Sequence, residues 1–215
     1  ISRILRKNYL LGAIQGAAMS QTASFILASS SPRRKELLQR EGYRFEVIAS
    51  GVDEETLISK GMSCVEAARR LALAKALDVA ALYPDRLVMG ADTLVDLNGN
   101  LIGKPADAAE AALIVRQLFV SPHKVITGLA LVWKERGIQI AKTDTTIVYP
   151  RKMTEAQIAK HIDGGTWQGK AGAYAIQETA DQFVERIEGS FTNVIGLPME
   201  LVKSLLESIG ISLRT

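Results

Sequence analysis

The chain is poor in the residues that build disulfides and metal centres. Its 215 residues include one cysteine, Cys64, and two histidines, His123 and His161. A single cysteine excludes an intramolecular disulfide and a zinc site made of thiolates alone, and it is typical of the reducing cytoplasm, where we expect this protein to act. The two histidines lack metal-ligand spacing, which favours packing or surface roles for them.

Long apolar runs are missing as well. No segment offers ~18 uninterrupted apolar residues, so we expect no membrane span and no membrane partner. The content of 47% hydrophobic and 23% charged residues is typical of a soluble globular protein. The net charge of +3 favours small anionic ligands. It does not require nucleic acid, and the basic run 33–35 lacks the aromatic stacking platform of an RNA-binding surface, so we expect no nucleic-acid partner.

The start of the chain differs from the rest. Three cations and an apolar run over 9–14 faintly resemble a secretory leader, an alternative that stays open. Met19, followed by Ser-Gln-Thr, resembles a natural start, so we interpret residues 1–18 as an upstream translated stretch or a cloning remnant. We predict that residues 1–23 form an extension outside the core, and that 24–215 form one domain without a linker or an internal repeat.

The order of apolar periodicities and turn signals predicts an α/β fold. An Asn-Gly pair at 98–99 lies between apolar flanks and predicts a hairpin over 96–101. Ser63 and Glu66 form the pattern of a capping box at the start of a long helix. We expect one elongated domain with two lobes and a ligand cleft between them. The expected strands are 25–28, 45–49, 87–92, 124–132, 138–148, 173–176, 183–187 and 191–195, and the expected helices are 32–41, 63–82, 107–119, 154–161 and 198–208.

The segment 26–38 predicts an anion site. An apolar strand is followed by three serines, Pro32 and the cations Arg33, Arg34 and Lys35. Proline suits the first position of a helix, serines cap helices or bind ligands, and the free N–H groups of a helix start attract phosphate oxygens.

Four further charged residues are candidates for chemistry. Asp92 ends an apolar strand, which is where α/β sheets concentrate their ligand-binding groups, although an Asp at a turn is the alternative. Lys75 shares a helix face with apolar residues, so its ammonium must either snorkel to solvent or meet an anion. Lys104 lies between Gly103 and Pro105 in a rigid loop and is otherwise an ordinary surface lysine. Glu54 lies in an acidic cluster that could hold a divalent metal or simply be solvated.

These residues together favour phosphate chemistry. The sequence contains no nucleophile elbow, Walker A loop or dinucleotide glycine fingerprint, which removes the commoner covalent and P-loop routes. Cations that hold phosphates and carboxylates that orient or deprotonate a water suit the metal-assisted attack of water on a polyphosphate.

The chain from about Phe25 to Ser208 resembles the Maf family of nucleoside triphosphate pyrophosphatases. Each motif is weak by itself, and their number and order carry the resemblance. The matching blocks are Leu27 to Arg34, Val52-Asp53-Glu54, Lys75-Ala76, Gly90 to Thr93, Gly103-Lys104-Pro105, His123 to Thr127, Lys170 to Gln177 and Glu188 to Pro198.

The resemblance implies a long, curved mixed sheet with flanking helices, related to inosine triphosphatases and forming two lobes around a cleft. It implies hydrolysis between the α and β phosphates, with Mg²⁺ or Mn²⁺ as the cofactor and a homodimer as one arrangement. Asp92 matches the proposed proton acceptor, and Glu54, Lys75 and Lys104 match residues associated with catalysis. Glu54 and Asp92 are also the expected metal ligands, and Ser29 and Arg34 match the phosphate-holding loop.

Three positions imply the branch of the family. Arg33, Thr93 and Gln177 match the branch that prefers dTTP and UTP, and a 7-methyl-GTP branch differs there. A glutamine amide can donate to a pyrimidine carbonyl while it accepts from the ring imide N–H, although Gln177 could instead satisfy nearby backbone. The family's link with inhibition of septum formation leaves a nucleotide-binding regulator of cell division as the alternative to an enzyme.

Overall fold

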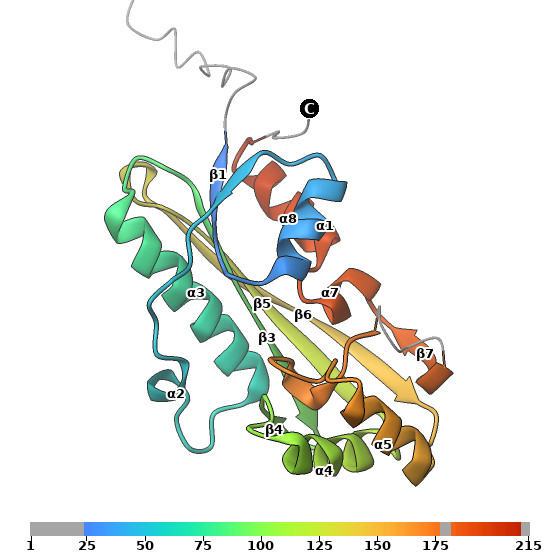
Figure 1. The fold of residues 1–215 in the computed structure, drawn as a ribbon. Helices are drawn as coiled ribbons and strands as arrows, with labels where there is room; N and C mark the ends of the chain where they lie inside the picture. Colours follow the sequence, from blue (N-terminus) through green and yellow to red (C-terminus); the bar gives the residue numbers. More distant parts are fainter. Residues whose placement is uncertain (1–23, 177–181, 212–215) are drawn as a thin grey trace, which may run out of the picture.

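The computed structural model describes residues 24–176 and 182–211, which form a seven-stranded mixed sheet flanked by helices (Figure 1). The strand order is β2-β1-β3-β5-β6-β7, with β4 paired to the far end of β3. Strands β2, β1 and β3 run parallel, and the others pair antiparallel, which confirms the expected mixed α/β fold. The strands are β1 (Phe25–Ala28), β2 (Phe45–Val47), β3 (Val88–Leu97), β4 (Asn100–Ile102), β5 (His123–Trp133), β6 (Ile138–Pro150) and β7 (Val184–Glu188).

Most helices begin where the sequence predicts. The side chain of Ser63 accepts a hydrogen bond from the backbone N–H of Glu66 at 3.2 Å, so it caps the helix that follows. Asn98 and Gly99 both have positive φ and form the turn between β3 and β4. The helices are α1 (Pro32–Arg40), α2 (Glu54–Leu57), α3 (Cys64–Leu82), α4 (Ala108–Leu118), α5 (Glu155–Asp163), α7 (Phe191–Ile195) and α8 (Met199–Ser208), with 3₁₀ turns η1 (Lys134–Arg136) and η2 (Ala171–Ala173).

Two predicted strands are wrong. Residues 191–195 form helix α7, because Ser190 caps the N–H of Asn193 and Gly196, at φ 126°, ends the turn. The segment 173–176 begins in the 3₁₀ turn η2 and pairs with no strand. Short apolar runs predict burial, but they do not distinguish a strand from a buried helical turn.

The two faces of the sheet carry different layers. On one face, odd-numbered residues such as Leu129 and Leu131 pack under α1 and α8 at one end of the sheet. At the other end of that face, Val125 and Val148 pack under α4 and α5. Figure 1 shows these two groups of helices separated along the long strands. The fold thus has two apolar cores on one face, as expected for two lobes.

Helix α3 covers the opposite face at unusually close range. A Cβ added to Gly90 would lie 2.3 Å from the carbonyl oxygen of Ala72, and one added to Gly128 would lie 2.0 Å from that of Ala68. Glycine is therefore required at both positions for the helix backbone to approach the sheet. This contact fixes the height of α3 above β3 and β5.

Within the described part of the chain, no helix has both the length and the apolar character needed to cross a membrane.

Candidate active site

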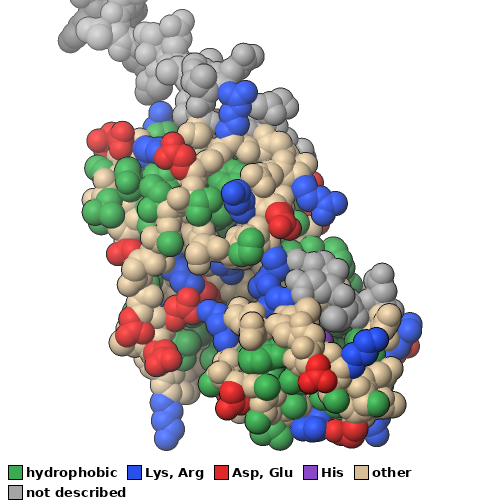
Figure 2. All heavy atoms as spheres, in the orientation of Figure 1, with side chains coloured by type: hydrophobic (Ala, Val, Ile, Leu, Met, Phe, Trp, Pro, Cys, Tyr) green, Lys and Arg blue, Asp and Glu red, His purple; other side chains and the backbone are tan. Residues whose placement is uncertain are grey.

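A cavity of about 760 Å³ lies between the two groups of helices. Figure 2 shows a hollow on this face, surrounded by lysine and arginine side chains with acidic side chains beside them. Its walls come from the loop between β1 and α1, from α3, from the middle of β3, from the loop that holds Lys104, from residues 168–171 and 174–176, and from the end of α7. Segments far apart in the sequence therefore meet at one site.

The middle of β3 reaches this cavity through a gap in the sheet. Strand β1 pairs with β3 only as far as Gly90, and β4 begins to pair at Val95. Between these positions β3 has a neighbouring strand only on its β5 side. Asp92 and Thr93 lie in this gap, and both side chains line the cavity although they belong to opposite faces of the strand.

Lys75 of α3 joins two carboxylates. Its Nζ lies 2.5 Å from Oδ1 of Asp92 and 2.7 Å from Oε1 of Glu54, and Lys75 is only 8% exposed. Of the two expected alternatives, snorkelling to solvent or meeting an anion, the structure shows the second. Burial acts to raise the pKa of Glu54, but the hydrogen bond and charge of Lys75 and the charge of Lys104 outweigh it, so the pKa lies below its usual value.

Asp92 keeps one oxygen uncommitted. Its Oδ1 is bound by Lys75, while its Oδ2 is buried without a hydrogen-bond partner among the described residues. A buried carboxylate oxygen in that state is costly unless a ligand, a cation or a water completes it. The geometry therefore favours a role for this oxygen in contact with a ligand.

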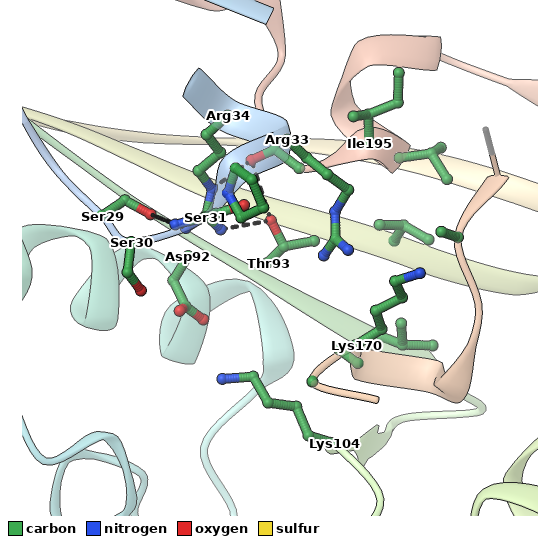
Figure 3. A pocket seen from close by; sticks show the side chains of 18 of the residues that line it. Ser29, Ser30, Ser31, Arg33, Arg34, Asp92, Thr93, Lys104, Lys170 and Ile195 are labelled. Atoms are coloured by element: carbon green, nitrogen blue, oxygen red, sulfur yellow. Dashed lines mark hydrogen bonds between the residues drawn. The ribbon is translucent and has the colours of Figure 1, made fainter. Parts of the chain in front are cut away.

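Three cations extend into the cavity from separate elements. Lys104, in the loop after β4, lies 3.5 Å from Oε2 of Glu54. Figure 3 shows the charged ends of Arg33, from the first turn of α1, and Lys170 directed into the same space. Lys170 is 8% exposed, and its burial in a cavity wall marks it as a candidate that the sequence reasoning did not single out. Its position in the block from Lys170 to Gln177 is the signal that could have found it.

Arg34 has a different environment from Arg33. Its Nε donates to the carbonyl of Gly196 at 2.8 Å, its Nη1 to Oγ of Ser29 at 2.9 Å, and its Nη2 to Oγ1 of Thr93 at 3.0 Å. Burial lowers the pKa of Arg34, and the charge of Asp92 opposes that effect. Arg34 thus forms hydrogen bonds with both Ser29 and Thr93, and all three residues were expected at the substrate.

The start of α1 matches the expected anion site in one respect and differs in another. Pro32 occupies the first helical position, as predicted, but Ser31 makes no side-chain cap. The hydroxyl of Ser29 instead accepts from the N–H of Ser31 at 3.3 Å. An uncapped helix start beside the cavity leaves first-turn N–H groups for a ligand.

Both histidines have packing roles, as predicted. Nε2 of His123 lies 2.8 Å from the hydroxyl of Tyr174, and Nε2 of His161 lies 2.8 Å from the carbonyl oxygen of Ala173. Burial lowers the pKa of His123 to about 4. Together these contacts fasten the segment after Lys170 to the lobe that contains α4 and α5.

One expected site residue, Gln177, lies outside the described residues. No group of three or more histidine, cysteine or acidic side chains able to hold a metal occurs within 24–176 and 182–211. Any divalent cation at Glu54 and Asp92 would therefore need further oxygen ligands from another source.

Comparison with protein families settles the affiliation of the chain. The model of the family described as Maf-like protein matches residues 24–209. The chain belongs to the Maf family. The resemblance inferred from the motifs is confirmed, and most residues that line the cavity of this Maf protein belong to the blocks that carried that inference.

Curated relatives match over nearly their whole length. A dTTP/UTP pyrophosphatase of Pelotomaculum thermopropionicum is 41% identical over 86% of this chain and 96% of its own. A dTTP/UTP pyrophosphatase of Geotalea uraniireducens is 43% identical over 89% of this chain and 98% of its own. Among solved structures, a HAM1 protein from Coxiella burnetii matches with a TM-score of 0.47 and 15% identity, covering 87% of this chain and 98% of that one.

Proposed function

We propose that this Maf protein hydrolyses dTTP and UTP to the nucleoside monophosphate and pyrophosphate. The observation that carries the proposal is the Lys75-linked pair of carboxylates at the edge of a cation-lined cavity. Curated relatives named as dTTP/UTP pyrophosphatases support the choice of substrate.

The charges of the cavity suit a triphosphate. Among the described residues, five cations and three carboxylates line it, and this surplus of two positive charges suits an anionic ligand. Arg33, Lys104 and Lys170 are placed to offset phosphate charge, and the charge that develops on the leaving pyrophosphate would be stabilised by the same groups. The cations are Arg33, Arg34, Lys75, Lys104 and Lys170, and the carboxylates are Glu36, Glu54 and Asp92.

Asp92 is the proposed general base. Water attacks the α-phosphorus while its proton passes to the Asp92 carboxylate, and the bond from the α-phosphorus to the α–β bridging oxygen breaks, so pyrophosphate leaves with that oxygen. Lys75 holds Oδ1, which leaves Oδ2 to receive the proton. Glu54 fixes Lys75 from its other side.

The residues present fit a divalent metal that arrives with the nucleotide. Mg²⁺ is usually held by one or two protein carboxylates plus substrate phosphates and waters. Glu54 and Asp92 supply two such carboxylates, which both bind Lys75 and line the cavity. When bound, the ion would polarise the phosphate oxygens and neutralise charge.

A substrate panel tests the function. Purified protein is incubated with Mg²⁺ or Mn²⁺ and dTTP, UTP, CTP, GTP or 7-methyl-GTP, and pyrophosphate and monophosphate are quantified. We expect turnover to be fastest with dTTP and UTP. Preference for 7-methyl-GTP would assign the other branch, and tight nucleotide binding without turnover would replace the enzyme by a nucleotide-binding regulator of septum formation.

Replacement of Asp92 tests the base. Loss of a general base lowers turnover by about 10²- to 10⁴-fold, so Asp92→Asn should lower kcat for dTTP within that range. Asp85→Asn is the matched control, since Asp85 is exposed and does not line the cavity. Wild-type pyrophosphate release from Asp92→Asn would remove Asp92 from this role.

Three further assignments accompany the proposed function. We expect it to act in the cytoplasm, where a free buried thiol such as Cys64 persists and where nucleotide pools lie. A homodimer and the absence of a nucleic-acid partner stay predictions. Size-exclusion chromatography with light scattering, and a gel-shift assay with single-stranded RNA, test them directly.

A further inference from the structure

Thr93 lies at a junction of hydrogen bonds on the cavity floor. Its Oγ1 accepts from Nη2 of Arg34 at 3.0 Å and lies 3.0 Å from Oγ1 of Thr127 and 3.3 Å from the carbonyl oxygen of Gly196. Arg34 binds that same carbonyl through Nε. One hydroxyl therefore links β3 to α1, to β5 and to the end of α7.

The network continues away from the cavity. Oγ1 of Thr127 donates to the carbonyl oxygen of Asn193 at 3.2 Å. The amide of Asn193 donates to the carbonyl of Val125 and to Oγ1 of Thr146, each at 3.0 Å. Asn193, Thr127 and Thr146 are all fully buried. These bonds fasten α7 to the sheet, and through Gly196 they fix the distance between α7 and the loop that holds Ser29 and Arg34.

A threonine hydroxyl has one hydrogen to donate. In Thr93 that hydrogen goes to a protein oxygen, either Oγ1 of Thr127 or the carbonyl of Gly196. The hydroxyl of Thr93 therefore uses its hydrogen within the protein, and one of its lone pairs accepts from Nη2 of Arg34.

We propose that Thr93 is a positioning residue, which orients Arg34, and through it Ser29, in the wall that receives phosphate. The resemblance to the dTTP and UTP branch implied that Thr93 contributes to the choice of nucleotide. In this proposal Thr93 acts instead on the binding of phosphate, which all nucleotides share. The inference rests on the proposed function in taking this wall as the phosphate site.

Inorganic pyrophosphate is the deciding probe because it has no base. Its affinity in the presence of Mg²⁺ is measured by calorimetry for wild type, Thr93→Val and Thr93→Ser. Valine keeps the shape of threonine but removes the hydroxyl that accepts from the charged Arg34. We therefore expect Thr93→Val to bind pyrophosphate about tenfold more weakly than wild type. Serine keeps the hydroxyl and should bind within about twofold of wild type, since the same bonds can form. Thr145→Val, on the exposed part of β6, is the matched control.

Nucleotide selectivity gives a second readout. If Thr93 positions the wall, Thr93→Val lowers kcat/KM for dTTP, UTP and CTP by a common factor, and their ratios stay as in wild type. Wild-type affinity for pyrophosphate combined with an altered ratio of dTTP to CTP would overturn the inference. Equal losses in Thr93→Ser and Thr93→Val would also overturn it, because the hydroxyl would then not be the acting group.

The outcomes separate this inference from the proposed function. If wild type releases no pyrophosphate from any nucleotide, the proposed function fails, while the pyrophosphate affinities still decide the role of Thr93. If wild type does not bind pyrophosphate, no phosphate wall exists and the inference fails. Should Thr93→Val not fold, Arg34→Lys replaces it. Lysine retains the charge but cannot make three fixed bonds, so pyrophosphate binding should weaken while the nucleotide ratios stay unchanged.

Discussion

At the scale of single residues, two adjacent arginines have different environments that the sequence does not distinguish. Arg33 and Arg34 have the same chemistry, and both were expected at the substrate. Because successive residues of a helix point about 100° apart, Arg33 extends into the cavity while Arg34 turns inward to three protein acceptors. For Lys75, by contrast, the apolar helix face left two alternatives, snorkelling to solvent or meeting an anion, and Asp92 and Glu54 supply the anion.

His123 predicts how stability depends on pH. Its pKa is lowered to about 4 in the fold, whereas an unfolded chain takes up the proton near pH 6.5. The unfolded state therefore binds the proton more readily, and stability is lost as pH falls from 6.5 towards 4. Between pH 7.5 and pH 5 this residue should contribute a loss of roughly 2 kcal/mol in the free energy of unfolding.

The measurement is urea denaturation at both pH values for wild type and His123→Gln. Glutamine cannot titrate, so its loss of stability between the two values should be smaller than that of wild type by roughly 2 kcal/mol. Equal losses in the two proteins would show that His123 does not carry this dependence.

At the scale of elements, the sequence predicts where α3 begins but not which strands it packs against. The Ser63 cap and the apolar periodicity identify the helix from sequence alone. Its close packing on Gly90 and Gly128 depends on which strands lie beneath it, and no local pattern encodes that. The same limit explains α7 and η2, whose short apolar runs fit a strand as well as a buried turn.

Gly128→Ala tests that packing. Its Cβ would lie 2.0 Å from the carbonyl oxygen of Ala68, a backbone atom that cannot move without shifting α3. We expect a loss of at least about 2 kcal/mol in the free energy of unfolding, measured in urea, as for other overpacked sites. Gly51→Ala is the control, since its nearest contact would be at 4.0 Å. Equal effects at both positions would argue against the packing explanation.

At the scale of the whole molecule, we propose that the folding unit begins near Ser24. The family model starts at residue 24, and Phe25 is already fully buried in the core. A chain that starts at Ser24 should keep the wild-type kcat/KM for dTTP. Its melting temperature should stay within about 2 °C, since 1 kcal/mol corresponds to a shift of about 2 to 4 °C at this size. A larger fall in the melting temperature, measured by circular dichroism, would place residues 1–23 in the core.

The sequence predicted the class of fold and several charged residues that line the cavity, but not how they contact one another. Motifs identified Asp92, Lys104 and Glu54 as candidates, and the cavity brings them together. The bond from Arg34 to the carbonyl of Gly196 spans 162 residues and involves a backbone atom, so side-chain identity gives no signal for it. Lys170 was missed although it begins a matching block, because the motif alone does not show that its side chain is buried in a cavity wall.

The gap in the sheet beside β3 has a consequence for how this site can change. Asp92 and Thr93 act on opposite sides of one strand, so a slip of one residue in β3 would exchange a proposed base for a positioning hydroxyl. Nine paired residues between β3 and β5 hold the register against such a slip. Point substitution can therefore alter this site gradually, whereas the insertion or deletion of a single residue between Val88 and Asp92 would abolish it in one step.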